Sequence, residues 1–580
     1  MIKRLSKCIR EYKLPSILAP IFISFEVILE VFIPKIMGLL IDNGIEKSDT
    51  SYVLRAGLVL VCLCSLSLIC GVTSGTAAAK ASAGFAKNLR HDMYHNVQSF
   101  SFASIDKFST SGLVTRLTTD VTNLQNSFQM IIRIAVRSPA MLIFSLVMAL
   151  SINAKISAIF LCVIPFLAAG LFLIISHAHP IFKRIFKTYD KLNGVVNENL
   201  HGIRVVKSFV REKEEEKKFK AVSGTIFSDT KKAEGFLAFN APLMQLSSYT
   251  CMILIAWFGA KLIINTGATE MTTGDLFSVI TYTMQILSTL MMLSMIFVML
   301  TMSKASGERV CEVLDEKTDL VNPENPVMQV KDGSVEFENV GFSYAKGSNN
   351  LCLKNVNLTI KSGETVGIIG ATGSSKTSFV QLIPRLYDVT EGKVKVGGTD
   401  VREYDLDTLR NEVAMVLQKN VLFSGTIKDN LRWGNENATD EEMIEACKLA
   451  QADPFINEMP DGYDTYIEQG GTNVSGGQKQ RICIARSLLK KPKILILDDS
   501  TSAVDTATDA KIRTAFREFI PETTKIIIAQ RISSIQDADK IIVLDGGEVS
   551  AFGTHEELMC SSEIYKEVYT SQVKGGSDDE

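Results

Sequence analysis

The sequence lacks the cysteine pattern of a disulfide-stabilised or zinc-binding protein. Its 11 cysteines are scattered, no C-x-x-C pair occurs, and Cys62, Cys64 and Cys70 lie inside an apolar run. Paired spacings mark structural disulfides and zinc sites, so we expect reduced thiols that are buried or face lipid. His91 and His95 lie one helical turn apart, but no third ligand is evident, which favours a solvated helix face over a metal site.

The chain also lacks an excess of charge of either sign. Its 580 residues include 61 basic and 64 acidic side chains. Such a balance creates no global field that would attract a polyanion, so we predict no nucleic-acid partner. A cleavable signal peptide is not expected either, because the first apolar run is too long and starts too late.

Long apolar runs crowd the first half of the chain. Six of them reach about the 20 residues that a membrane-spanning helix needs. They are Leu14–Ile41, Tyr52–Ala78, Ile134–Ile152, Ile156–Ser176, Leu243–Ile264 and Leu276–Met302. Lys and Arg concentrate at the N-terminus and in the two long segments 80–133 and 177–239, which places these on the cytoplasmic side. We therefore predict a multi-pass protein of the plasma membrane, in contact with lipid.

The two long cytoplasmic segments keep helical periodicity with charged faces, so the membrane helices are expected to continue into the cytosol. Residues 109–120 and 202–212 each place a turn at the far end of such an excursion. These tips are candidates for docking on a cytoplasmic domain, the alternative being plain solvated helix. Residues 1–13 carry five basic side chains among apolar ones, which suits either a helix on the membrane surface or a solvated start to the first span.

Two carboxylates, Glu26 and Glu30, lie one turn apart inside the first span. A charge at membrane depth is costly and usually faces a cavity or a partner. The pair therefore serves either substrate handling, hydrogen bonding between helices, or placement near the interface.

The second half of the chain has a different pattern. From Val335 on, strands and helices alternate with glycine-rich turns, which is typical of an α/β nucleotide-binding domain. We predict a transmembrane domain at 1–305, a linker at 306–330, the nucleotide-binding domain at 331–573 and a disordered tail at 574–580.

A phosphate-binding loop follows the apolar, β-prone stretch Thr365–Ile369 and precedes a helix. Backbone N–H groups of such a turn, together with the helix dipole, point at an anion. Lys376 would reach the β- and γ-phosphates, and the Thr377 hydroxyl would ligate Mg²⁺. The binding residues predicted in this loop are Gly370, Thr372, Gly373, Ser374, Ser375, Lys376, Thr377 and Ser378.

Two further elements follow the phosphate loop in the sequence. The apolar strand Ile494–Leu497 ends in Asp498, the usual place for a carboxylate that holds Mg²⁺ through water. The turn Val474–Gln478 precedes a basic helical stretch, and its small residues suit a second phosphate contact.

In this order and spacing the motifs identify a resemblance to the half-transporters of the ABC exporter family, over nearly the whole chain. The resemblance implies ATP and Mg²⁺ as ligands and a dimer in which each ATP lies between one chain's phosphate loop and the other's signature motif. It assigns adenine stacking to Tyr344, Mg²⁺ sensing to Gln418, and the loop that crosses to the partner to Ser502–Asp505. It also makes Thr377, Gln418 and Asp498 the metal-binding set. The implied signature motif consists of Ser475, Gly476, Gly477 and Gln478.

The chain departs from the family pattern at three positions of one composite site. Asp499 stands where the family has a catalytic glutamate, Gln530 where it has a switch histidine, and Ser375 where the loop has glycine. The shorter carboxylate withdraws by more than about 1 Å, a displacement that can cost on the order of 10²-fold in rate. Gln530 can hydrogen-bond a phosphate but cannot carry imidazolium charge.

These departures predict a heterodimer with a second ABC half-transporter, in which this chain's own phosphate loop hydrolyses ATP poorly and its intact signature motif completes the partner's site. The expected function is ATP-driven export of a small hydrophobic or amphipathic substrate, such as a drug, lipid or hydrophobic peptide. The alternatives are a homodimeric lipid or drug flippase with slow ATPase, and a non-transporting sensor that binds ATP.

Overall fold

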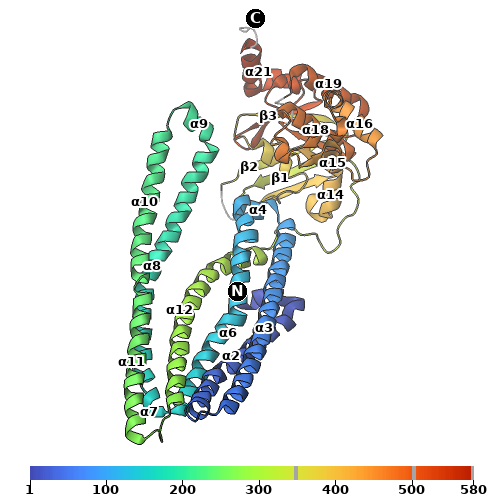
Figure 1. The fold of residues 1–580 in the computed structure, drawn as a ribbon. Coiled ribbons are helices and arrows are strands. Elements are labelled where there is room, and N and C mark those ends of the chain that lie inside the picture. Colours follow the sequence, from blue (N-terminus) through green and yellow to red (C-terminus); the bar gives the residue numbers. More distant parts are fainter. Residues whose placement is uncertain (345–349, 500–503, 576–580) are drawn as a thin grey trace. The chain divides into compact units, whose positions relative to one another are not determined.

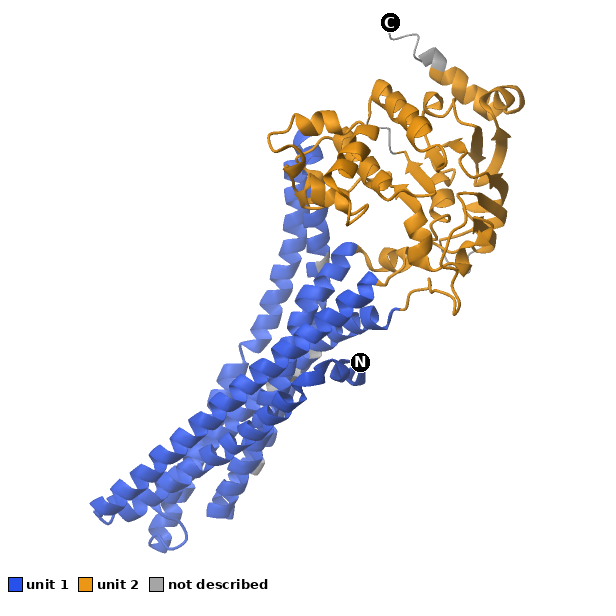
Figure 2. Ribbon diagram, turned by 90° about the vertical axis from the view of Figure 1, so that its right-hand side faces the viewer, with its two compact units in different colours: residues 1–98, 110–316 blue, residues 99–109, 317–580 orange. Residues whose placement is uncertain are grey.

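The chain forms two compact units in a computed structural model that describes residues 1–344, 350–499 and 504–575. The first unit comprises Met1–Gln98 and Thr110–Glu316, and the second comprises Ser99–Ser109 and Lys317–Glu580 (Figure 2). A short segment from within the N-terminal half thus belongs to the unit formed by the C-terminal half. Residues 576–580 of the predicted tail lie outside the described residues.

The first unit is entirely helical. Its helices are α1 (Ile2–Ser6), η1 (Lys7–Tyr12), α2 (Lys13–Leu40), η2 (Ile41–Ile45), α3 (Thr50–Gln98), α5 (Thr110–Thr115), η3 (Arg116–Asp120), α6 (Val121–Ile152), α7 (Ala154–Ser157), α8 (Ile159–His201), α9 (Ile203–Ser208), α10 (Glu212–Leu237), α11 (Asn240–Thr266) and α12 (Thr273–Asp315) (Figure 1). Six helical stretches are long and apolar enough to cross a membrane, which confirms the predicted number of spans.

The lipid surroundings explain why this unit is helical. In hydrocarbon every backbone N–H and C=O must be satisfied within the segment, and a continuous helix achieves this. Small residues then let neighbouring helices approach: Ala19 of α2 and Ala78 of α3 are fully buried, and the Ser74 hydroxyl donates to the Ala19 carbonyl at 2.9 Å. Helix α3 has 49 residues and continues well past the predicted span end at Ala78.

Helix α12 runs to Asp315, about three helical turns beyond the predicted domain end at residue 305, so the start of the predicted linker is still helix. The reason is a tertiary contact. Asp120 is almost fully buried and accepts hydrogen bonds from Ser306 (2.8 Å) and from Arg309 Nε (2.7 Å). This pairing holds the last turns of α12 as helix where the apolar pattern has already stopped.

The second unit carries two main sheets. A six-stranded sheet has the order β12-β11-β3-β10-β9-β6, and a four-stranded sheet has the order β2-β1-β4-β5. The strands are β1 (Val335–Phe342), β2 (Leu353–Ile360), β3 (Thr365–Gly370), β4 (Glu391–Val396), β5 (Thr399–Asp400), β6 (Val413–Val416), β7 (Gly425–Thr426), β8 (Tyr466–Ile467), β9 (Ile494–Asp498), β10 (Thr524–Ile528), β11 (Lys540–Asp545) and β12 (Glu548–Gly553). In the larger sheet only β12 runs antiparallel, and every residue of β9 and β10 is buried.

Helices surround these sheets and confirm the predicted α/β class. They are α4 (Phe102–Phe108), α13 (Lys376–Gln381), η4 (Val401–Glu403), α14 (Leu406–Glu412), α15 (Ile427–Arg432), α16 (Asp440–Leu449), α17 (Asp453–Asn457), η5 (Gly462–Asp464), η6 (Gln469–Gly471), α18 (Gly476–Leu489), α19 (Thr506–Phe519), η7 (Ile532–Ser534), α20 (His555–Ser561) and α21 (Glu563–Gly575).

The first predicted docking tip lies earlier in the chain than expected. The segment that joins the second unit is α4, whereas the predicted stretch 109–120 forms α5 and η3 of the first unit. Ser109, at φ 54°, breaks the helix between the two. The second predicted stretch, 202–212, contains α9, a short helix without buried residues at the tip of the α8–α10 hairpin (Figure 1).

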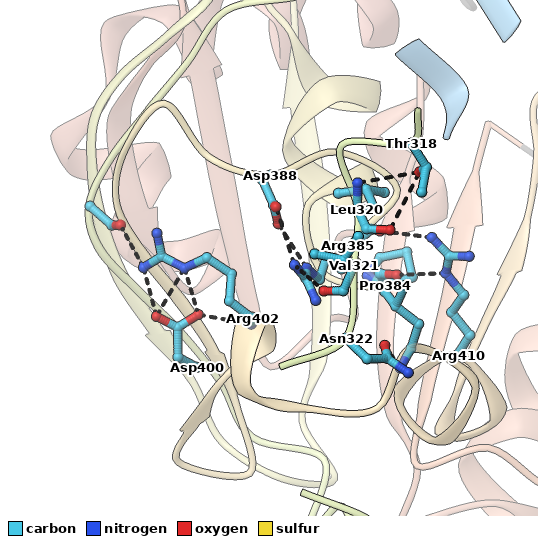
Figure 3. A network of polar contacts seen from close by, with 12 residues as sticks. Thr318, Leu320, Val321, Asn322, Pro384, Arg385, Asp388, Asp400, Arg402 and Arg410 are labelled. Carbon is cyan, nitrogen blue, oxygen red and sulfur yellow. Dashed lines mark hydrogen bonds and ion pairs between the residues drawn. The ribbon is translucent and has the colours of Figure 1, made fainter. Parts of the chain in front are cut away.

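The segment after α12 is tied into the second unit by a buried arginine (Figure 3). Arg385 donates to the Val321 carbonyl at 3.4 Å and pairs with Asp388 at 2.8 Å, and its side chain is 5% exposed. Arg410 donates to the backbone carbonyl of Arg385 at 2.9 Å. Asn322 adds a second anchor through Asp405, at 2.5 Å. The chain that leaves the membrane helices is thereby fastened to the nucleotide domain at 321–322.

We expect Arg385→Met to loosen this attachment, because it leaves Asp388 without its cation and the Val321 carbonyl without its donor. Amide hydrogen exchange of residues 317–322 in the full-length chain should accelerate by about 10-fold or more. Lys395→Met is the matched control: it removes an exposed pair with Glu338, and such pairs contribute about 0–1 kcal/mol. Equal exchange in the two variants would contradict this assignment of the anchor.

Candidate nucleotide site

The predicted site residues gather because four neighbouring strands run parallel. The strands β3, β10, β9 and β6 are adjacent in the sheet, so their carboxyl ends meet at one edge. The phosphate loop follows β3, Asp499 follows β9 and Gln530 lies two residues beyond β10. Gln418 lies two residues beyond β6. Residues up to 160 positions apart are thereby brought to one place by backbone pairing alone.

The phosphate loop needs special backbone conformations at its glycine positions. A Cβ on Gly370 would lie 2.1 Å from the Leu544 carbonyl oxygen, so only glycine fits where β3 meets β11. Gly373 has φ 86°, a left-handed value that glycine adopts without strain. Ser375 has φ 68° and therefore occupies the left-handed region with a Cβ present. The substitution at 375 thus keeps the loop conformation and adds steric cost at that point.

Lys376 opens α13 and folds back over the loop. Its Nζ donates to the carbonyls of Gly370 at 2.7 Å and Ala371 at 2.9 Å, and lies 3.5 Å from the Ser374 hydroxyl. Burial lowers the pKa of Lys376 below its ordinary value, and the charges of Asp499 and Asp498 oppose this shift. Thr372, by contrast, is exposed at the outer side of the turn. The ammonium is thus at the position where a phosphate-binding lysine is needed.

Thr377 and Asp498 offer the oxygen ligands that Mg²⁺ prefers. The Thr377 hydroxyl donates to Asp498 Oδ1 at 3.2 Å, so the two oxygens already face one another. Burial raises the pKa of Asp498, and the hydrogen bond from Thr377 acts in the opposite direction. A divalent cation bound here would neutralise charge on the transferred phosphate, and these two side chains would hold it.

Asp499 is engaged by both amides of the site. Its Oδ2 accepts from Gln530 Nε2 at 2.6 Å and from Gln418 Nε2 at 3.4 Å. The residue is 8% exposed and has φ 50°, a left-handed conformation. The two substituted positions of the family pattern, 499 and 530, are therefore hydrogen-bonded to each other, and the amide nitrogen of Gln418 also reaches Asp499.

The signature motif forms a well-capped helix start. Ser475 is the N-cap of α18: its hydroxyl accepts from the Gln478 amide at 3.3 Å, and the Gln478 side chain accepts from the Ser475 amide at 2.9 Å. Ser475 and Gly476 are exposed, and Gly477 follows them in the first turn. The N–H groups of this helix start are thus available to an anion, while Gln478 is occupied in holding the cap.

Of the predicted crossing loop, Ser502 and Ala503 lie outside the described residues. Asp505 is the N-cap of α19 and accepts from the Thr508 amide at 2.9 Å, a hydrogen bond that lowers the pKa of Asp505.

Tyr344 lies close to the phosphate-loop helix. Its hydroxyl is 2.8 Å from Ser378 Oγ, and the residue is about half exposed. Phe342 contacts the ring edge to face, with centroids 4.9 Å apart. The tyrosine predicted to stack on adenine is thus attached to the helix that begins with Lys376.

Sequence reasoning missed Tyr387, which joins this aromatic cluster to α4. Its ring lies edge to face with Tyr344 at 5.2 Å, and its hydroxyl donates to Asp106 Oδ2 at 3.0 Å. Burial and the Asp106 carboxylate raise the pKa of Tyr387, so the phenol stays protonated as the donor. Phe102 adds a ring contact from α4 at 6.1 Å. No motif marks this residue, because the partner, Asp106, lies 281 positions away.

Taken together, these features define a membrane-embedded chain with a P-loop ATPase domain. Comparison with known families agrees: the description "ABC transporter transmembrane region" matches residues 16–291, and "ABC transporter" matches residues 353–502. The uncharacterized ABC transporter ATP-binding protein YfiB of Bacillus subtilis is 37% identical over 97% of both chains. The ATP-dependent lipid A-core flippase of Desulfotalea psychrophila is 30% identical over 99% of both chains.

A solved structure of a bacterial Atm1-family ABC exporter with ATP bound has the same fold, with a TM-score of 0.81, 24% identity and coverage of 97% of this chain and 99% of that one. With the relatives above, the chain therefore belongs to the ABC transporter family. It is a half-transporter, a transmembrane domain fused to a nucleotide-binding domain, and it acts in ATP-driven transport. It lies in the plasma membrane with its nucleotide-binding domain in the cytoplasm.

If Tyr344 stacks on adenine, Tyr344→Ala should weaken ATP binding by about 10- to 100-fold, since stacking contributes about 1–3 kcal/mol per base. Tyr344→Phe should stay within about 3-fold, because it keeps the ring and loses only the hydroxyl contacts with Ser378 and Gln381. Equilibrium titration with a fluorescent ATP analogue measures both. Equal losses in the two variants would show that the hydroxyl, not the ring, matters.

We expect Asp106→Ala and Tyr387→Phe to release α4 from the nucleotide domain, because the first removes the acceptor oxygen and the second the donor hydroxyl. Each removes one half of the same hydrogen bond, so the double variant should be no worse than the more damaging single one. The measurement is hydrogen exchange in residues 99–109 of the full chain, with Lys107→Gln as a control on the same helix. Additive effects would place the two side chains in separate interactions.

Proposed function

We propose that this chain is the subunit of a heterodimeric ABC exporter whose own phosphate loop forms the weakly hydrolysing site. The observation that supports this best is the short hydrogen bond between Asp499 and Gln530. A general base must be free to accept a proton from the attacking water. Asp499 is one methylene shorter than glutamate, is largely buried, and is already hydrogen-bonded to two amides.

The residues of this site that contact the nucleotide itself indicate that ATP affinity is retained. Lys376 lies over the loop, Thr377 faces Asp498, and Tyr344 is about half exposed beside the loop helix. Affinity for ATP comes from these groups, whereas the departures at 499 and 530 affect the step in which water attacks. The expected outcome is a site that holds ATP and closes the dimer but turns over slowly.

The signature helix supports the complementary role. Ser475 and Gly476 are exposed at a capped helix start, which is the geometry that binds an anion presented by another molecule. In a head-to-tail pair this surface completes the site built on the partner's phosphate loop. The proposed partner is a second ABC half-transporter with an intact catalytic glutamate and switch histidine.

The proposed substrate is amphipathic or hydrophobic. The first unit exposes many large apolar side chains on its spans, as a lipid-facing protein must, and it places charged groups inside them. The relative named as a lipid A-core flippase favours lipid flipping as the second candidate function for this fold.

The heterodimer proposal predicts opposite effects for two substitutions in this chain. In the purified heterodimer, Ser475→Ala should lower ATPase by about 10²-fold, since it removes a donor at the competent site. Asp499→Ala should leave the ATPase within about 2-fold, because that carboxylate contributes little turnover. Steady-state phosphate release from reconstituted vesicles measures both.

The lone chain supplies the control, and it should show almost no ATPase. Robust turnover by this chain alone would overturn the proposal. So would loss of all activity in the Asp499→Ala heterodimer if replacing the partner's glutamate by glutamine left activity untouched.

A further inference from the structure

A wide-open cavity of about 650 Å³, a groove rather than an enclosed pocket, is lined by α2, α3 and α6 in the membrane-spanning part of the first unit. Its lining combines apolar residues such as Ile33 and Leu68 with the charged side chains of Glu26, Glu30 and Arg133. Charges at membrane depth are retained only where they face a cavity or a partner.

Arg137 accounts for part of this charge. It pairs with both oxygens of Glu30, at 2.7 and 2.9 Å, and with one oxygen of Glu26. The other oxygen, Glu26 Oε2, is buried without a hydrogen-bond partner among the described residues, and Glu26 as a whole is 8% exposed. An unmade hydrogen bond to a buried carboxylate is costly, so this oxygen lacks a donor that a ligand can supply.

Arg133, in contrast, is a hydrogen-bond donor without an acceptor in the described ranges of the chain. In the part of the chain that the structure describes, its guanidinium has neither a hydrogen bond nor an ion pair, although it lines the same cavity. A guanidinium presents several N–H donors in a fork that matches phosphate or carboxylate.

Two glycines of α3 bring these charges into register. A Cβ on Gly71 would lie 2.9 Å from Glu26 Oε2, and a Cβ on Gly75 would lie 3.7 Å from the Arg133 guanidinium. Residues 71 and 75 are one helical turn apart on one face. The unpartnered acceptor and the unpartnered cation therefore lie against positions of α3 that are one helical turn, about 6 Å, apart.

We propose that this cavity binds an amphipathic molecule whose head group carries an ammonium close to a phosphate or carboxylate. Glu26 Oε2 accepts a hydrogen bond from the ammonium, and Arg133 donates to the anionic group. The apolar body lies along the side of the cavity lined by Ile33 and Leu68. This inference rests on the proposed function only in treating the bound molecule as the substrate, because binding itself requires no nucleotide.

The test is native mass spectrometry of the full-length chain in dodecyl maltoside, without ATP. Three probes separate the charges: lysophosphatidylethanolamine carries both groups, lysophosphatidylglycerol only the anion, and dodecylamine only the ammonium. We expect the first to bind at least about 10-fold more tightly than the other two. Glu26→Gln should abolish the advantage of the ammonium, and Arg133→Gln that of the phosphate.

Each variant has a matched control. Glu270→Gln removes a carboxylate from an exposed ion pair with Lys155 and should change no affinity. If Glu26→Gln does not fold, Gly71→Ala tests the same oxygen, because the new methyl crowds it. Gly57→Ala, on the same helix but outside the lining of the cavity, would meet no atom within 4 Å and should bind like the unmodified chain.

Equal affinity for the three probes, or an equal loss of all three on Glu26→Gln, would overturn the proposal and leave a purely structural charge cluster. Nanodiscs distinguish the source of the ligand. Competition by bilayer phosphatidylethanolamine, but not phosphatidylcholine, supports the site and assigns it to a membrane lipid. Undiminished probe binding supports the site and assigns it to a free amphipath. The binding result stands whether or not the ATPase asymmetry does, so failure of either proposal is recognisable on its own.

Discussion

The parallel pairing of β3, β10 and β9 is the constraint on which the nucleotide domain depends. These strands are buried along nearly their whole length, so their register is set by the core on both faces of the sheet. Once the register is set, the loop after Gly370, the carboxylate of Asp498 and the backbone before Gln530 end at the same edge. The site is thus a consequence of sheet geometry, and the side chains at three strand ends decide its chemistry.

The same sheet geometry explains why two of the departures from the family pattern, at positions 499 and 530, are in contact with each other. Asp499 and Gln530 follow neighbouring strands, and their side chains meet at 2.6 Å. Gln530 supplies a donor that a shortened carboxylate can reach. The signature helix α18 begins on a separate element and keeps a complete capping box, so its surface is unaffected by what happens at the strand ends. Two composite sites of unequal activity require that the signature helix can stay intact while the residues at the strand ends change.

In the membrane domain, too, polar side chains from different elements are hydrogen-bonded to one another. Glu26, Glu30 and Arg137 form one cluster across α2 and α6, in which the arginine satisfies three of the four carboxylate oxygens. Pairing of this kind makes charge tolerable inside hydrocarbon. The remaining acceptor and the nearby Arg133 distinguish the cavity from a closed structural ion pair.

Local patterns in the sequence by themselves determined the six spans, the α/β class of the second half and the resemblance that names the family. Each depends on residues near one another in the chain: the apolar length of a span, or a glycine turn between a strand and a helix. Contacts between distant residues were decided only by the tertiary structure. The Glu26–Arg137 pair is 111 residues apart, and the docking of α4 through Asp106 and Tyr387 spans 281. No periodicity or spacing records such pairs, because helix packing and strand order bring them together only after the chain has folded.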